Sequence, residues 1–295
     1  MTAEIRKFDK IAIVGVGLIG GSLALILKEK GLVRTITGIG RTMENLETAL
    51  ELGIVDEITQ EAALGVRGAE LVVVCVPVLK IGEVIRQALP GLSAPCIITD
   101  VGSVKARVEE DVSKITLPKG VEFVPAHPVA GTEESGAAAA FPELFDGRLT
   151  VITPGPGTSE EAAGVVKELW ISAGSRVVEM DAGEHDKVFA LVSHLPHVIA
   201  YNLVNTVAAE KSLYGSGSRK AIDYSAGGFR DFTRIASSSP EMWSDICTMN
   251  REFLVEVIES FESRLSRIKE FIARDDYDGL KDEFNRAKEI RDSLD

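Results

Sequence analysis

Three of the four histidines lie in two short polar motifs and are the first candidates for chemistry. His127 stands in PAHPVAGTEESG, where a predicted strand ends, while His194 and His197 share one helix face in SHLPH. Imidazole titrates near neutral pH, so His127 is suited to act as a general base. A histidine merely hydrogen-bonded at a strand end is the alternative. His194 and His197 have no third ligand at zinc or di-iron spacing, so we predict no metal site.

Two further segments supply a hydroxyl group and positive charge. TDVGSVK follows a predicted strand and places Ser103 at a turn into a helix. AGGFRDFTRIA contains Arg230 and Arg234, two guanidinium groups that can point at a carboxylate, and Asp231 can orient one of them. A solvated loop with an internal ion pair is the alternative for this segment.

A glycine-rich turn near the N-terminus indicates a dinucleotide site. Gly15, Gly17 and Gly20 form G-x-G-x-x-G between a predicted strand and a predicted helix. The first glycine permits the tight turn, the second lets the backbone approach a pyrophosphate, and the third lets the helix pack against the strand. The start of the helix offers N–H groups to the phosphates. A glycine turn that binds nothing is the alternative, but the flanking strand and helix favour nucleotide binding.

The choice between NAD and NADP stays open. The predicted strand over residues 35–39 ends in Gly40-Arg41, with no acidic residue at its tip to accept the ribose hydroxyls. A guanidinium pairs with phosphate, so Arg41 favours NADP slightly; stacked on adenine or lying in solvent, it would leave NAD acceptable. We expect further cofactor contacts at the first helix and at the end of the strand over 71–76, from Leu18, Ile19, Val76 and Pro77.

These motifs need a scaffold of alternating strands and helices. Helices are predicted over 18–30 and 43–52. Such alternation is typical of a parallel sheet with helices on both faces, which binds ligands beyond the carboxyl ends of its strands. We therefore predict an α/β fold with an N-terminal Rossmann-type domain over residues 1–181. Apolar, β-branched runs predict its strands over 11–14, 35–39, 71–76, 96–99, 122–124, 149–152 and 176–178.

After Asp181 the strand pattern stops, and an all-helical domain is predicted over residues 182–295. A domain of this size must bury much of its apolar stripe, either within the chain or against a second copy. We expect a homodimer through this domain. The stripe has helical spacing and consists of Leu254, Val257, Ile258, Phe261, Leu265, Ile268 and Ile272.

The composition limits the partners. The 295 residues are 45% hydrophobic and 26% charged, as in soluble globular proteins. A net charge of −13 disfavours nucleic acid and anionic membranes. Three cysteines are too few for a disulfide framework, the N-terminus has no signal-peptide core, and the apolar stretch over 71–79 is too short to cross a membrane. We expect a cytoplasmic protein that binds a small molecule.

In this order, GVGLIGGS, DVGSVK, HPVAGTEESG, SHLPH and GGFRDFTRIA resemble the prephenate/arogenate dehydrogenase family of tyrosine biosynthesis. The resemblance runs from about Lys10 into the last helices. It implies a Rossmann domain, a helical dimerisation domain and an active site between them. It also implies NAD(P)-dependent oxidative decarboxylation of prephenate to 4-hydroxyphenylpyruvate. Dehydrogenation of arogenate, which gives tyrosine directly, is the alternative.

The resemblance assigns roles by motif. His127 takes the proton of the ring hydroxyl as hydride leaves for the nicotinamide, and Ser103 holds that hydroxyl or the nicotinamide end. Arg234 clamps a carboxylate of the dianionic substrate, with His197 at its other end. Four more residues complete the substrate site: His194 and Ser193 line it, Glu133 shapes or gates the cleft, and Trp243 forms part of its wall.

Two other classes of protein remain as alternatives. A two-domain Rossmann reductase such as a β-hydroxyacid dehydrogenase is expected to use a lysine on an interdomain helix, and no comparable motif is evident here. A regulator that binds NAD(P) without turnover would keep the three glycines but would not need Ser103, His127 and Arg234 together.

Overall fold

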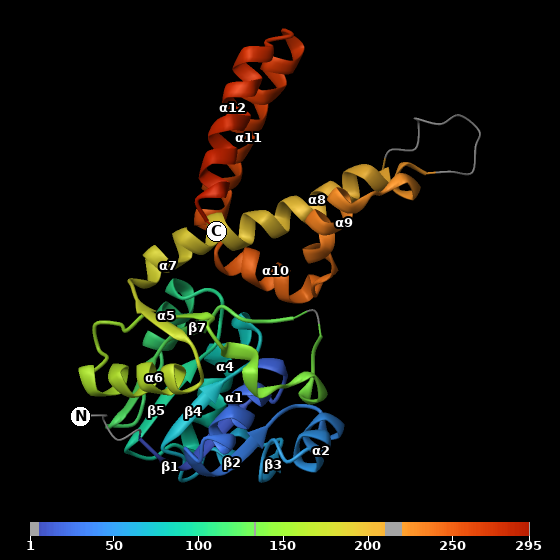
Figure 1. Cartoon of the computed structure of the whole chain (residues 1–295). Coiled ribbons are helices and arrows are strands. Elements are labelled where there is room, and N and C mark those ends of the chain that lie inside the picture. The colour runs from blue at the N-terminus through green and yellow to red at the C-terminus, as the bar shows by residue number, and fades with distance from the viewer. Residues whose placement is uncertain (1–5, 133, 210–219, 295) are drawn as a thin grey trace. The chain divides into compact units, whose positions relative to one another are not determined.

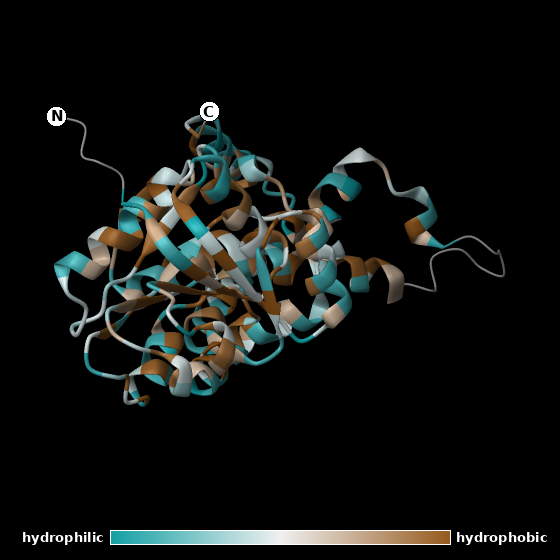
Figure 2. Ribbon diagram, turned by 90° about the horizontal axis from the view of Figure 1, so that it is seen from below, coloured by the Kyte–Doolittle hydropathy of each residue, from teal (hydrophilic) through white to brown (hydrophobic). Residues whose placement is uncertain are grey.

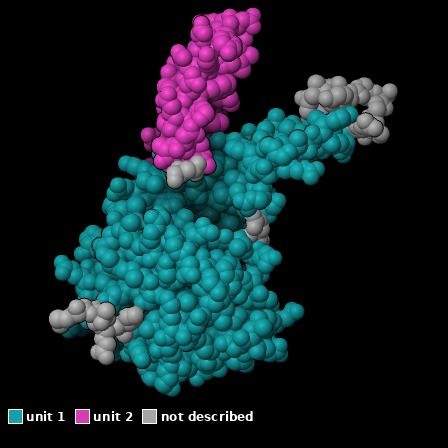
Figure 3. Space-filling model, viewed as in Figure 1, with its two compact units in different colours: residues 1–250 teal, residues 251–295 magenta. Residues whose placement is uncertain are grey.

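The computed structural model describes residues 6–132, 134–209 and 220–294 and divides into two compact units, residues 1–250 and 251–295 (Figure 3). The first unit contains a six-stranded parallel sheet with strand order β3-β2-β1-β4-β5-β6 (Figure 1). This is the doubly wound order of dinucleotide-binding folds, and it reverses between β1 and β4. The predicted fold class is thereby confirmed. The strands are β1 (Phe8–Val14), β2 (Val33–Ile39), β3 (Glu57–Thr59), β4 (Leu71–Val74), β5 (Cys96–Asp100) and β6 (Val121–Val124).

The central strands are apolar on both faces because helices cover both. Ile11 and Ile13 belong to one buried cluster, and Ala12 and Val14 belong to a second, as the two-residue period of a strand requires. These apolar strands occupy the interior in Figure 2. The helices of this part are α1 (Leu18–Glu29), α2 (Met43–Glu51), α3 (Ala62–Gly65), α4 (Ile81–Ala88) and α5 (Ala106–Ser113).

The later strands form a separate sheet with the order β7-β8-β9. β7 (Ala126–Pro128) runs antiparallel to β8 (Leu149–Ile152), and β8 runs parallel to β9 (Arg176–Glu179), which follows helix α6 (Glu160–Ser172). β8 and β9 confirm the strands that the apolar runs over 149–152 and 176–178 predict. β3 and β7 have only three residues each and are too short to show a period. β7 matters most, because His127 is its central residue.

Beyond Glu179 the described residues form helices and turns, as the sequence predicts. The stretch Ala182–Ala209 is long and apolar enough to cross a membrane by length and composition alone, criteria that the core helices of soluble proteins also meet. It also carries all the polar side chains of SHLPH. The elements are α7 (Ala182–Phe189), the π-helical turn η5 (Ala190–His194), α8 (Leu195–Ala209), α9 (Gly227–Thr233), the 3₁₀ turn η7 (Arg234–Ser237) and α10 (Pro240–Met249).

The compact units divide after Asn250, whereas the proposed boundary between the functional domains lies at 181/182. The difference has a packing cause. Trp243 and Ile246 of α10 belong to the same buried cluster as strand β4, and α7 packs on α5. The first helices after the last strand are therefore part of the compact unit that contains the sheet.

The second unit is a helical hairpin of α11 (Arg251–Ala273) and α12 (Tyr277–Asp292). Asp276 caps α12, because its side chain accepts the N–H of Gly279 at 2.9 Å. The predicted stripe lies on α11, but Leu265 and Ile272 are 53% and 60% exposed in the single chain. Intrachain packing thus buries Leu254 but leaves these two residues of the stripe exposed.

Candidate active site

The glycine turn has a shape that only glycine allows at two positions. Gly15 has φ +97°, and a Cβ atom there would lie 2.1 Å from the carbonyl oxygen of Cys75. A Cβ atom on Gly20 would lie 2.5 Å from the carbonyl oxygen of Gly15, so the helix could not approach the strand. At Gly17 a Cβ atom would meet nothing within 4 Å. The open space at Gly17, at the start of α1, fits an approaching pyrophosphate.

The other predicted cofactor residues surround this turn. Leu18 and Ile19 open α1, where the first N–H groups have no partner within the helix. Strand β4 ends at Val74, and the next residue, Cys75, donates its N–H to the Val14 carbonyl at 2.6 Å. Val76 and Pro77 follow directly. Exposed Arg41 lies between β2 and α2. The glycine turn, Val76 and Pro77 thus follow the two strands between which the strand order reverses, and Arg41 follows the neighbouring strand β2.

A buried ion pair supports the strand that carries His127. Lys105 and Asp100 are both fully buried, and the ammonium group contacts the Asp100 carboxylate. Lys105 Nζ also donates to the carbonyl of Ala126 at 2.7 Å, and Asp100 Oδ1 accepts the Ala126 N–H at 3.2 Å. Burial lowers the pKa of Lys105, and Asp100 offsets part of this effect. Both backbone polar groups of the residue before His127 are thus held by one ion pair.

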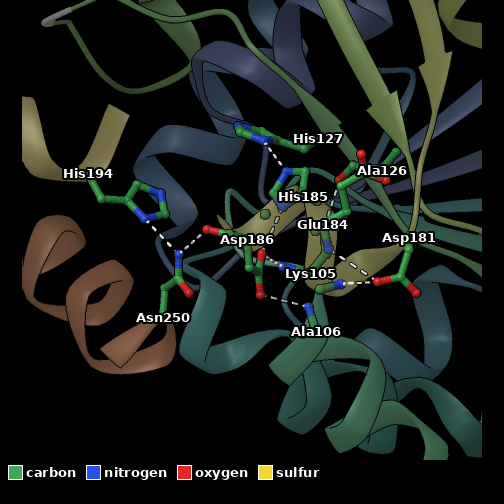
Figure 4. A network of polar contacts seen from close by, with 12 residues as sticks. Lys105, Ala106, Ala126, His127, Asp181, Glu184, His185, Asp186, His194 and Asn250 are labelled. Carbon is green, nitrogen blue, oxygen red and sulfur yellow. Dashed lines mark hydrogen bonds and ion pairs between the residues drawn. The ribbon is translucent and has the colours of Figure 1, made fainter. Parts of the chain in front are cut away.

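His127 is 8% exposed and lies at the end of a line of polar groups. Its Nδ1 is 2.8 Å from Nε2 of His185, so its Nε2 is the ring nitrogen left for a ligand (Figure 4). The ring also packs on Phe189, with centroids 4.6 Å apart. Burial lowers the pKa of His127 well below its usual value, and His185, Lys105 and His194 add to the effect. His127 is therefore a neutral imidazole at physiological pH.

A second cluster joins SHLPH to α10. His194 Nδ1 is 3.0 Å from the amide nitrogen of Asn250, which also donates to the carbonyl of Asp186 at 2.8 Å. The ring of His197 stacks on Trp243 with centroids 3.5 Å apart, and its Nδ1–H donates to the Ser193 carbonyl at 2.9 Å. Burial lowers the pKa of His194 to about 4 and also lowers the pKa of His197.

The remaining predicted substrate residues lie on different segments. Ser103 is half-buried between β5 and α5, and its backbone faces His194. Arg234 begins η7 with an exposed side chain, and Tyr201 of α8 holds this segment by donating to the Ser238 carbonyl at 2.6 Å. Glu133 lies outside the described residues. Within the described ranges, no cluster of three potential metal ligands is present.

Sequence reasoning missed the buried polar groups that surround His127 and His194. The missed residues are Asp100, Lys105, His185, Asp186 and Asn250, all of them buried. Two clues were present. Asp100 and Lys105 belong to TDVGSVK, and the fourth histidine is followed by an aspartate just after the last strand. Asn250 gave no local sign, because its partners are far away in the sequence.

An open G-x-G-x-x-G turn on a doubly wound sheet, with a buried imidazole on a strand beyond it, defines a nicotinamide-dependent oxidoreductase. Two family descriptions match most of the chain: "Prephenate dehydrogenase, nucleotide-binding domain" over residues 23–179 and "Prephenate dehydrogenase, dimerization domain" over residues 181–286. The chain belongs to the prephenate dehydrogenase family.

Individual relatives agree. A prephenate dehydrogenase of Bacillus subtilis is 36% identical over 97% of this chain and 76% of its own length. A cyclohexadienyl dehydrogenase of Zymomonas mobilis is 38% identical over 97% of this chain and 96% of its own length. The structure is also similar to prephenate dehydrogenase from A. aeolicus in complex with hydroxyphenyl propionate and NAD+, with a TM-score of 0.89, 35% identity and full coverage of both chains.

We expect the stability of the fold to depend on the buried ion pair. Lys105→Met leaves the Asp100 carboxylate buried without its cation, so we expect the free energy of unfolding to fall by about 3–5 kcal/mol. Urea unfolding followed by circular dichroism measures this loss. Lys114→Met is the matched control, because Lys114 pairs with Glu110 and Asp111 at the surface and its loss should change little. Equal effects of the two substitutions would contradict the role assigned to Lys105.

Proposed function

We propose that the chain catalyses the NAD(P)-dependent oxidative decarboxylation of prephenate to 4-hydroxyphenylpyruvate. The observation that carries this proposal is the buried, neutral His127, whose Nδ1 is occupied and whose Nε2 is left for the substrate. The family matches and the prephenate dehydrogenase of B. subtilis support the choice of substrate.

His127 moves the proton of the reaction. Its Nε2 accepts the hydrogen bond of the ring hydroxyl and takes up that proton as the ring carbon gains carbonyl character. Bound nicotinamide supplies the acceptor for the hydride that leaves this carbon. The bond to the ring carboxylate then breaks and releases carbon dioxide, and its electron pair makes the ring aromatic. His127 returns the proton to the phenolic oxygen, so no net proton stays on the enzyme.

Positive and polar groups of the helical segments hold the dianionic substrate. Arg234 is the proposed carboxylate clamp, and Tyr201 supports its segment through the bond to Ser238. His197, stacked on Trp243, is the proposed contact for the other end. Ser103 is proposed to hold the hydroxyl or the nicotinamide end. Three further residues keep their proposed places in the substrate site: His194, Ser193 and Glu133.

A second candidate function is the dehydrogenation of arogenate. Prephenate and arogenate differ by a keto or an amino group on the side chain, a difference that one hydrogen-bonding residue can decide. The identity to the cyclohexadienyl dehydrogenase of Z. mobilis favours keeping this candidate. For the cofactor, exposed Arg41 and the absence of an acidic residue at the tip of β2 support a slight preference for NADP.

The helical domain is proposed to form a homodimer. The match to a dimerization domain supports it, and so do apolar side chains left exposed in the single chain. The exposed apolar residues include Val188, Leu191, Val192, Phe232, Leu265 and Ile272.

We propose a cytoplasmic location for the protein. All three cysteines are free, which agrees with this location.

The first prediction from this function is turnover. We expect reduced nicotinamide to form when the protein is given prephenate, and the assay should pair prephenate and arogenate each with NAD and NADP. His127→Asn should lower kcat at least about 10²-fold, because positioned proton transfer contributes about 10²–10⁴-fold. Its dissociation constant for the dinucleotide should not change. If folded wild-type protein binds dinucleotide yet turns over neither substrate, the proposed function is wrong.

Two arginine substitutions should act on different ligands. Arg41→Ala should raise the KM for NADP and leave the KM for prephenate unchanged, because Arg41 follows the carboxyl end of β2 and is proposed to bind the 2′-phosphate. Arg234→Ala should raise the KM for prephenate and leave the KM for NADP unchanged, because it removes the carboxylate clamp. Each variant is the control for the other in steady-state kinetics. An Arg41→Ala variant that loses NAD and NADP equally would contradict the 2′-phosphate role, and an unchanged prephenate KM in Arg234→Ala would contradict the clamp.

If the protein is a homodimer, we expect its mass in solution to be twice 31.7 kDa. Light scattering coupled to size-exclusion chromatography measures it directly. A monomer at micromolar concentration would contradict the proposed homodimer.

A further inference from the structure

Two buried residues behind His127 have no part in the reaction described above. Nε2 of His185 lies 2.8 Å from Nδ1 of His127, and Nδ1 of His185 lies 2.8 Å from Oδ1 of Asp186. His185 is fully buried and Asp186 is 2% exposed. The three side chains form a continuous line from helix α7 to strand β7 (Figure 4).

Asp186 determines which ring nitrogen of His185 carries the hydrogen. Its Oδ1 accepts the backbone N–H of Lys105 at 2.8 Å, and its Oδ2 accepts that of Ala106 at 2.9 Å. A carboxylate with this orientation can only accept, so Nδ1 of His185 carries the hydrogen that points at Oδ1. A neutral His185 then has a bare Nε2, which accepts a hydrogen bond.

The same constraint passes to His127. Because Nε2 of His185 accepts, Nδ1 of His127 must donate, and Nε2 of His127 is left bare. If His185 were protonated, its Nε2–H would donate to Nδ1 of His127. A neutral His127 would then carry its hydrogen on Nε2, which could not accept a proton from the substrate. Burial lowers the pKa of both imidazoles and so disfavours that state. The charged and titratable groups that act on the two rings are Asp186, Asp100, Lys105 and His194.

We propose that His185 and Asp186 are positioning residues that hold His127 in the tautomer with hydrogen on Nδ1. The bare Nε2 is then aimed at the substrate before it binds, and no rearrangement of hydrogen is needed when the proton moves. This inference rests on the proposed function, since a bare Nε2 is useful only if His127 receives a proton. A packing role is the competing explanation, because the His185 ring also stacks on Phe189 with centroids 4.4 Å apart.

Two substitutions separate tautomer control from packing. His185→Asn places an amide near the position of Nδ1, where it can still donate to Asp186, but offers His127 no acceptor. His185→Gln reaches the position of Nε2 and offers its Oε1 to His127. We expect His185→Asn to lower kcat about 10²-fold with little change in the KM for prephenate, and His185→Gln to recover most of that loss. Equal losses in both variants that follow their melting temperatures would overturn the proposal.

Nuclear magnetic resonance of ¹⁵N-labelled histidine rings reads the tautomer without turnover. Four histidines are few enough to assign by single substitutions. We expect hydrogen on Nδ1 of His127 in the wild type and in His185→Gln, and a shift toward hydrogen on Nε2 in His185→Asn. Wild-type His127 with hydrogen on Nε2 would overturn the inference even if prephenate is turned over. The expected tautomer without turnover of either substrate would instead contradict the proposed function and leave the tautomer assignment standing.

Discussion

The site depends on the buried ion pair between Lys105 and Asp100. Two charges out of water must be fully satisfied by neighbouring polar groups, and here Ala126, on the strand of His127, forms one hydrogen bond with each of them. Through its backbone N–H, Lys105 also holds Asp186 of helix α7. One residue of the TDVGSVK turn thereby ties the parallel sheet, the second sheet and the first helix beyond the strands to a common point.

The dinucleotide turn is built on a different constraint, the close approach of backbone to backbone. Gly15 and Gly20 are required because α1 and the end of β4 crowd the turn, whereas the space at Gly17 is open. The side chain of Asn45 reinforces the turn: it donates to the Val16 carbonyl at 2.7 Å and accepts the Ala137 N–H at 2.9 Å. The glycine turn is therefore held by packing and hydrogen bonds, whereas the strand of His127 is held by a buried ion pair.

The helical segments between Glu179 and Asn250 belong to the same compact unit as the sheet because their side chains pack against it. Trp243 contributes to the apolar cluster of strand β4 and also stacks on His197. Asn250 connects His194 to the backbone of Asp186. Residues proposed to hold the substrate are thus joined to the residues that hold His127, which explains why compactness alone does not divide the chain at residue 181.

The sequence by itself determined the fold class, because continuous apolar runs and the glycine pattern are local properties of a buried parallel sheet and its first turn. It also indicated His127 and Ser103 as candidates, since polar residues that follow predicted strands stand out from apolar surroundings, and the SHLPH histidines, which share one face of a predicted helix. Only the tertiary structure decided that His185, Asp186 and Lys105 surround and support His127. His127 and His185 are 58 residues apart in the chain, and Lys105 and Asp186 are 81 apart. The same holds for Asn250 and for strand β7. Burial and long-range hydrogen bonds give these residues their roles, and no local pattern records which distant groups will meet when the chain folds.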